Sequence, residues 1–265
     1  MPDTDRSAAL VARVEGDVMV AAWSGESRTH GAWRIERVDG GFRLDVGGEC
    51  LHVSSRDAPT TFVLTGRWRP SLALPGDVGV LGRVPRRQAR TLRAAIRLAA
   101  ALVPVVEHAR RMWDLVADHE ARGVWIPHDA VAQVLTGRPP VPRVMGRRVD
   151  ADHRRWSAHL VEGEQLALRL LNADVAAWIA QVNERIVQAE LRDRKDFLDT
   201  VEKSPLTPEQ ARAVVTFDNR VRVIAAAGSG KTSVMVGRAA YAVERGLVPP
   251  ERILMLAFNT AAAEE

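Results

Sequence analysis

Cysteine and lysine are scarce in this chain, and each scarcity limits what the protein can be. Cys50 is the one cysteine among 265 residues, so no disulfide can form within the chain. Lysine occurs at Lys195, Lys203 and Lys231, and the rest of the 37 basic residues are arginines. A coding bias explains a general preference for arginine, but Lys231 lies in a motif where a flexible ammonium is chemically useful.

Long hydrophobic runs are also missing. The most apolar stretch, residues 94–106, contains Arg97 and is broken by Pro104, so it is too short to cross a bilayer. The first ten residues are polar and acidic and contain no secretory hydrophobic segment. The seven histidines lack the spacing of metal ligands. We therefore expect a cytoplasmic protein with no membrane segment.

The charge of the chain leaves two interpretations open. A formal net charge of +4 supports no strong electrostatic conclusion by itself. Arginines are concentrated in residues 83–97 and 143–155, where they could bind nucleic-acid phosphates. Solvated helix faces would explain the same arginines, and the composition favours this interpretation over nucleic-acid binding.

Composition divides the chain into three regions. Residues 1–75 predict a small β-rich module, because apolar residues alternate at Trp33 and Ile35 and again at Phe42, Leu44 and Val46, with glycine-rich turns between the runs. Residues 76–203 predict a helical region with a long helical arm. Residues 204–265 contain the motifs that indicate a chemical function. The expected fold is an α+β N-terminal region followed by the truncated start of an α/β P-loop domain.

Within the helical region, proline and glycine mark the expected breaks. We expect helices over residues 87–103 and 105–121, with Pro104 at their junction. A short helix over 129–135 should end at Gly137, and the basic, proline-rich segment 138–148 predicts a linker. Residues 152–203 then predict two helices that meet near residues 172–174.

The third region has the pattern of a βαβ unit. The apolar run VRVIA at residues 221–225 predicts a buried parallel strand, and ILMLAF at 253–258 predicts a second one. Between them lies AAAGSGKT, residues 225–232, followed by a helix from Thr232 that should end near Gly246. A strand, a glycine loop and a helix in this order predict a phosphate-binding site.

The loop has the residues that a triphosphate site needs. Gly228 and Gly230 allow backbone dihedrals that other residues avoid, so that amide groups can surround an anion. Lys231 can reach the β and γ phosphates of a nucleotide, and the Thr232 hydroxyl is placed to ligate Mg²⁺. The pattern departs from G-x-x-x-x-G-K-[ST] at its first position, which is Ala225.

Three segments together resemble superfamily 1 DNA helicases of the UvrD/Rep group, and within that group the DNA helicase IV type. They are SPLTPEQARAVV, AAAGSGKTSVMVGRA and ERILMLAFNTAAAEE, which cover residues 204–265. The β-rich and helical regions upstream are similar in layout alone.

The resemblance implies a role for each matching position. Gln210 corresponds to a glutamine that reads adenine, as its amide can offer a donor and an acceptor to the base edge. The implied ATP and Mg²⁺ site comprises Ala225, Ala226, Ala227, Gly228, Ser229, Gly230, Lys231 and Thr232, with Arg238 either close to the nucleotide or a plain surface residue. Ala257, Phe258 and Asn259 correspond to a segment that contacts single-stranded DNA. A lysine usual in that segment is replaced here by Ala261.

The same resemblance implies parts that this sequence does not contain. A helicase motor needs a Walker B Asp-Glu pair and a second motor domain, and no such pair follows Thr232. We therefore expect the truncated N-terminal part of an ATP-dependent 3′-to-5′ helicase acting on single-stranded or partly duplex DNA, with a possible protein partner for the N-terminal region. The alternatives are a non-enzymatic DNA- or protein-docking module and a different P-loop protein such as a nucleotide kinase.

Overall fold

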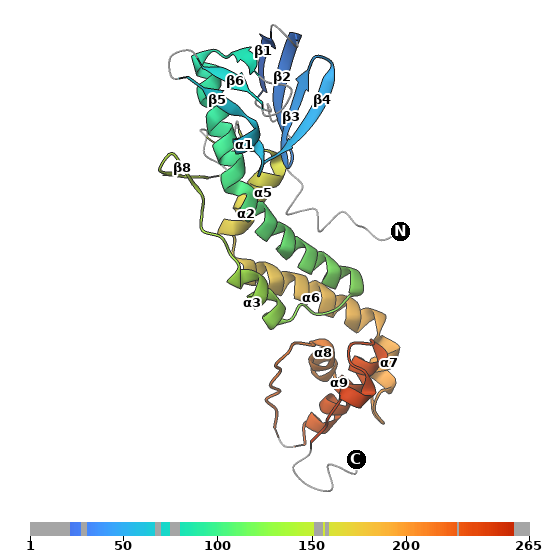
Figure 1. Cartoon of the computed structure of the whole chain (residues 1–265). Coiled ribbons are helices and arrows are strands. Elements are labelled where there is room, and N and C mark those ends of the chain that lie inside the picture. The colour runs from blue at the N-terminus through green and yellow to red at the C-terminus, as the bar shows by residue number, and fades with distance from the viewer. Residues whose placement is uncertain are drawn as a thin grey trace. The chain divides into compact units, whose positions relative to one another are not determined.

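The structure is a computed structural model, and it describes residues 22–27, 31–66, 70–74, 80–150, 156, 159–226 and 228–256. It is a mixed α/β protein with small antiparallel sheets and helices (Figure 1). The chain divides into two compact units: unit 1 comprises residues 1–110 and 137–173, and unit 2 comprises residues 111–136 and 174–265. This division differs from the three regions expected from composition, because the helical region contributes to both units. None of the helices in the described ranges is both long enough and apolar enough to span a bilayer.

Unit 1 begins with a four-stranded antiparallel sheet in the order β1-β2-β3-β4, which confirms the predicted β-rich module. The strands are β1 (Ala22–Ser27), β2 (Gly31–Val38), β3 (Gly41–Val46) and β4 (Glu49–Ser54). Two-residue turns at 39–40 and 47–48 join the last three, and Gly40, Gly47 and Gly48 have the positive φ values that such turns require. The predicted alternation sets the register: Ile35 lies opposite Leu44, and both are fully buried.

A second, three-stranded sheet completes the core of unit 1. It contains β5 (Val63–Thr65), β6 (Ser71–Ala73) and β7 (Val80–Arg83) and follows the short helix α1 (Ala58–Thr61). The core joins side chains of both sheets to the first half of α2 and includes Trp23, Trp33, Phe42, Phe62, Leu72, Leu92 and Ile96. Phe42 meets Phe62 edge-on, with ring centroids 5.4 Å apart.

The long helix α2 (Arg86–Arg122) corrects the prediction of two helices that meet at Pro104. Pro104 lies inside one continuous helix. A proline ring removes one backbone hydrogen bond, a cost that neighbouring packing can offset. Leu102 and Val105, on either side of the ring, are almost completely buried, so the helix continues because its apolar face stays in the core.

The segment after α2 contains more regular structure than expected. The predicted short helix is confirmed as α3 (His128–Thr136). The predicted linker, by contrast, contains a hairpin of two-residue strands, β8 (Arg143–Val144) and β9 (Arg147–Arg148). Buried Val144 and Val149 anchor this hairpin, a packing that the proline-rich composition does not reveal. The helix α5 (Glu162–Asn172) follows it and ends where a junction was predicted.

Unit 2 is helical in its described residues. It contains the last part of α2, then α3, α6 (Val175–Asp193), α7 (Lys195–Thr200), α8 (Pro208–Val215), α9 (Lys231–Glu244) and the short 3₁₀ turn η2 (Pro250–Arg252). Its core combines residues on both sides of the predicted boundary at 203/204: Val187, Leu198, Leu206, Val214, Val234 and Tyr241. The helices α8 and α9 therefore pack with α6 and α7 in a shared core.

The two parallel strands predicted beside the glycine loop are wrong in the described residues. Residues 221–226 and 253–256 form no ladder, and most of their apolar side chains are exposed, Ile224 by 84% and Leu254 by 80%. A parallel strand needs a hydrogen-bonded neighbour and a cover on each face. Neither segment has these partners in the part of the chain that the structure describes. Residues 257 and 258 of the second run lie outside it.

Candidate functional site

The glycine loop has the backbone conformation that its sequence predicts. Gly228 and Gly230 have φ values of +72° and +79°, in the left-handed region that favours glycine. Between them, Ser229 closes a tight turn, since its backbone amide and its hydroxyl both donate to the carbonyl of Ala226, at 3.3 and 2.7 Å. A Cβ atom added to Gly228 would meet nothing within 4 Å, so this side of the loop is open.

Lys231 is the first residue of α9, and its ammonium folds back over the loop. Nζ donates to the carbonyl oxygens of Ala226 at 2.7 Å and Ala225 at 3.2 Å. Thr232 follows in the first turn of the helix and is half-buried. The start of a 14-residue helix adds partial positive charge, so the open side of the loop suits an anionic group. Loop, lysine and helix start thus fit the phosphates of a nucleotide.

Gln210 contacts the loop from α8. Its Nε2 donates to the carbonyl of Ser229 at 3.0 Å, and its Oε1 accepts the backbone N–H of Thr207 at 2.8 Å. The second contact belongs to a capping box, because the Thr207 hydroxyl accepts the amide of Gln210 in return. The sequence Thr-Pro-Glu-Gln, residues 207–210, matches the pattern of a capping box. Both ends of the predicted adenine-reading amide are thus engaged within the chain, and adenine reading stays a prediction.

Arg238 has an unexpected location. Its guanidinium donates to the carbonyls of Ala213 and Thr216 at the end of α8, at 2.5 and 2.6 Å, and lies over the ring of Phe217. Burial lowers the pKa of this guanidinium. It satisfies carbonyls that have no partner within α8, so it links the helix before the loop to the helix after it. Sequence reasoning gave no sign of this role.

Gly237 brings α9 close to α8. A Cβ atom at this position would lie 2.9 Å from Cγ2 of Val214, which is fully buried. Gly237 therefore sets the spacing of the two helices that carry Lys231 and Gln210.

The segment just before the loop caps a helix about 90 positions upstream. Asp218 accepts hydrogen bonds from the Trp125 indole and from the backbone of His128, both at 3.1 Å, and the Asn219 side chain accepts from the backbone of Asp129. These acceptors satisfy free amides at the start of α3. No local pattern in the sequence could have indicated these contacts.

Some predicted site residues lie outside the described part of the chain. Ala227 of the loop is one of them, as are Ala257, Phe258 and Asn259 of the segment expected to contact DNA. The described residues hold no cluster of three or more histidine, cysteine, aspartate or glutamate side chains placed to bind a metal ion.

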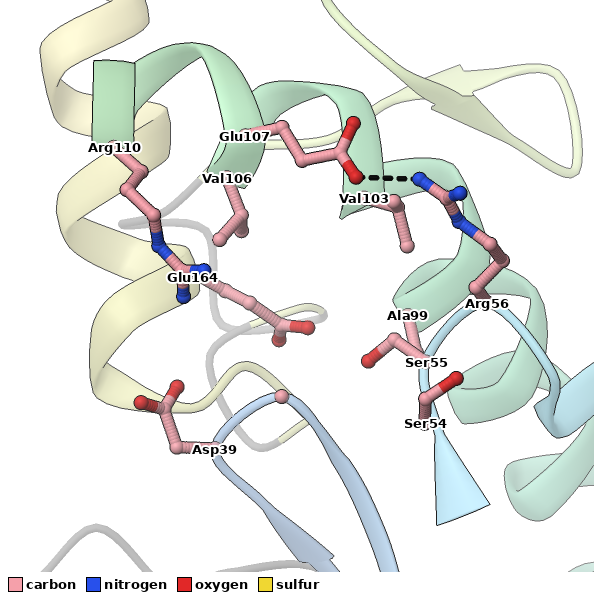
Figure 2. A pocket seen from close by; sticks show the side chains of 11 residues that line it. Asp39, Ser54, Ser55, Arg56, Ala99, Val103, Val106, Glu107, Arg110 and Glu164 are labelled. Carbon is pink, nitrogen blue, oxygen red and sulfur yellow. Dashed lines mark hydrogen bonds and ion pairs between the residues drawn. The ribbon is translucent and has the colours of Figure 1, made fainter. Parts of the chain in front are cut away.

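A separate pocket of about 250 Å³ lies in unit 1, between the 39–40 turn, residues 54–56, α2 and α5 (Figure 2). Its charged groups are mostly paired: Arg56 with Glu107 at 2.5 Å, and Glu164 with the buried Arg37 of β2. Burial raises the pKa of Glu164 even though Arg37 attracts its charged form. The Arg37–Glu164 pair joins the sheet to α5, so this pocket is better explained by packing than by nucleotide binding.

Comparison with known proteins gives these features a context. Residues 206–265 match the UvrD/REP helicase N-terminal domain. The predicted resemblance is confirmed for this segment. The chain is also 35% identical to DNA helicase IV of Escherichia coli (strain K12) over 165 residues, which are 59% of this chain and 22% of that protein. That alignment is much longer than the segment 206–265, so the similarity extends into the helical region.

Two further relatives match shorter stretches. A probable DNA helicase II homolog of Mycoplasma capricolum is 45% identical over 60 residues, 23% of this chain and 8% of that protein. A probable DNA helicase II homolog of Rickettsia conorii is 37% identical over 71 residues, 27% of this chain and 10% of that protein. The chain thus spans less than a quarter of the length of these relatives. No solved structure matches the chain significantly.

Proposed function

We propose that this chain is the N-terminal part of an ATP-dependent 3′-to-5′ DNA helicase, and that residues 225–232 bind the triphosphate of ATP with Mg²⁺. One observation carries the proposal. Gly228 and Gly230 form a left-handed loop at the start of α9, Lys231 closes over it, and this loop lies in the segment that matches a helicase domain. Hydrolysis of ATP would supply the free energy for moving along DNA. The direction of movement rests on the resemblance.

Each residue of the loop has a distinct task in this proposal. The Lys231 ammonium would leave the carbonyls of Ala225 and Ala226 and pair with phosphate oxygens, a stronger, charge-assisted contact. Thr232 would offer its hydroxyl to Mg²⁺. Gln210 would hold the loop through its contact with Ser229. To contact adenine as well, its amide would have to give up the hydrogen bond with Thr207.

We further propose that residues 1–265 alone bind ATP without turning it over at a motor-like rate. The sequence after Thr232 contains no aspartate, so it cannot supply the Walker B pair. DNA-stimulated phosphate release near one per second from this chain would contradict the proposal. The alternative, a docking module with a vestigial loop, predicts no ATP binding at all.

Calorimetric titration with Mg²⁺-ATP tests the site. Lys231→Ala should weaken binding by about tenfold or more, because a charge-assisted contact is lost. Lys203→Ala is the matched control, since Lys203 is exposed in the irregular segment between α7 and α8, and it should leave the affinity unchanged. Equal affinities for the parent and Lys231→Ala would refute phosphate binding by the loop.

Two variants of Gln210 separate its structural role from base reading. Gln210→Glu keeps the acceptor for the Thr207 amide, and therefore the capping box, but removes the amide donor. If Gln210 reads adenine, this variant should bind ATP and GTP almost equally while α8 stays folded. If it serves only the cap and the loop, Gln210→Ala should weaken both nucleotides by the same factor, and the parent should show no preference for ATP.

A further inference from the structure

The β8–β9 hairpin of unit 1 places an apolar residue at an exposed tip in an unusual conformation. Met145 and Gly146 form its turn, with φ values of +53° and +76°. Such turns normally use Asn, Asp or Gly, and Met145 is the one non-glycine residue with positive φ in the described ranges. Its side chain is 55% exposed, so no core contact explains its presence.

Three arginines surround this tip. Arg143 and Arg148 are directly opposite each other across the ladder, and Arg147 is opposite Val144. All three arginine side chains are exposed, and within the described ranges they make no side-chain hydrogen bond or ion pair. Like charges in opposite positions destabilise a strand pair. Stability within the chain therefore does not account for this arrangement, whereas an anionic partner would.

The base of the hairpin is well anchored. Val144 and Val149 are 3% and 2% exposed, and the Val149 amide donates to the carbonyl of Pro142 at 2.9 Å. The buried Trp156 indole donates to the carbonyl of Arg148 at 3.1 Å. Figure 1 labels the first strand of this hairpin as β8. A fixed base presents the three charges and Met145 as one unit.

We propose that the β8–β9 hairpin is a DNA contact outside the P-loop segment, in which Arg143, Arg147 and Arg148 bind phosphates and Met145 packs against a base. Guanidinium groups pair with phosphate through two parallel hydrogen bonds. Exposed apolar side chains such as methionine insert at base steps in several DNA-binding proteins. That the nucleic acid is DNA rests on the proposed function. The contact itself does not depend on ATP.

Salt-dependent binding of a fluorescently labelled 20-nucleotide single strand to the full chain tests the proposal by anisotropy. The triple variant R143Q/R147Q/R148Q should reduce the slope of log affinity against log salt by about 2, because three phosphate contacts are lost. The control R34Q/R43Q/R56Q removes the same charge from exposed arginines of unit 1 that already pair with Glu36, Asp45 and Glu107. It should change the slope by much less than one.

Met145→Gly distinguishes the contribution of the tip to DNA binding from the contribution of the three arginines. Glycine adopts the turn without strain, so this variant should unfold at the same temperature as the parent or higher. We expect its affinity for the strand to fall about fivefold, since an apolar packing contact with a base is lost, with an unchanged salt slope.

Several results would overturn the proposal. They are no binding of the strand by the parent chain, an unchanged slope in the hairpin triple variant, an equal change in the control, or poly-glutamate competing as well as DNA, which would indicate an acidic protein partner. Titration of the same preparations with Mg²⁺-ATP keeps a failure of the hairpin distinct from a failure of the P-loop.

Discussion

The two units contain similar apolar runs that have opposite structural outcomes. In unit 1, Ile35 and Leu44 lie in paired strands and are fully buried. In unit 2, the run at residues 221–225 and the described part of the run at 253–258 stay unpaired, and Ile224 and Leu254 are exposed by 84% and 80%. Strand propensity is therefore not what separates them, because the unpaired runs are also rich in valine, isoleucine and leucine.

The difference lies in where a strand finds its neighbour. In the four-stranded sheet, two-residue turns bring β3 and β4 back against the strand that precedes each of them. Even Trp33 and Val46, the β2–β3 partners farthest from the turn at 39–40, are therefore close in sequence. A parallel strand needs a crossover connection and a partner strand from a more distant part of the sequence. An apolar run thus predicts a strand reliably only where the sequence also supplies its neighbour.

Amide hydrogen exchange should show this contrast most strongly. The amides of Ile35 and Leu44 are expected to exchange at least about 10³-fold more slowly than those of Val223 and Leu254, because the ladder must open first. Mass spectrometry of peptides from the two regions measures the ratio. Similar protection in both would mean that residues 221–225 and 253–256 are paired in solution.

Breaking the buried ion pair of unit 1 should have the largest effect among single substitutions. Glu164→Ala leaves the Arg37 guanidinium, with side-chain exposure of 1%, without its carboxylate, and should cost about 3–5 kcal/mol of unfolding free energy. Denaturant titration, monitored by hydrogen exchange of the β2 and β3 amides, measures this loss of unfolding free energy. The double variant R37M/E164L should recover most of the loss, and a double variant as unstable as Glu164→Ala would show that the charge is not the cause.

Two adjacent glycines test how strictly the sheet is packed. A Cβ atom at Gly41 would collide with the carbonyl oxygen of Val53, so Gly41→Ala should cost about 3 kcal/mol. Gly40→Ala is the control: its φ of +75° disfavours alanine, but nothing lies within 4 Å, and about 1 kcal/mol is expected. Equal costs at both positions would argue against the β3–β4 register.

The smallest effect is expected at an exposed pair of unit 2. Hydrogen bonds from Arg212 and then from Gln188 lower the pKa of Glu184 from 4.5 to about 2. The unfolded chain therefore takes up this proton first, so the stabilisation is present above pH 4.5 and is lost as the pH falls towards 2. Glu184→Gln should remove this small part of the acid sensitivity, as seen in urea midpoints at about pH 5 and about pH 2.5. A variant that stays as acid-sensitive as the parent would contradict it.

The sequence predicted the local features of the fold and missed those that depend on distant partners. Turns at Gly40 and Gly48 and the left-handed glycines of the loop follow from residue type, and the structure confirms them. The continuous helix through Pro104 depends on core packing that no local pattern reveals. At the candidate site, Lys231 and the loop were predictable, whereas the contact of Arg238 with α8 joins residues 22 and 25 positions apart.

The shared core of unit 2 has a consequence for limited proteolysis. A protease that cuts after lysine has three exposed sites in this chain. Lys195 and Lys231 lie in helices, whereas Lys203 lies in the irregular segment between α7 and α8, where a protease can bind the backbone most easily. Val187 and Leu198 lie before that bond and Val214 and Val234 lie after it, yet all four pack in one core. A chain cut at Lys203 should therefore migrate as two bands under denaturing conditions and still elute as a single particle.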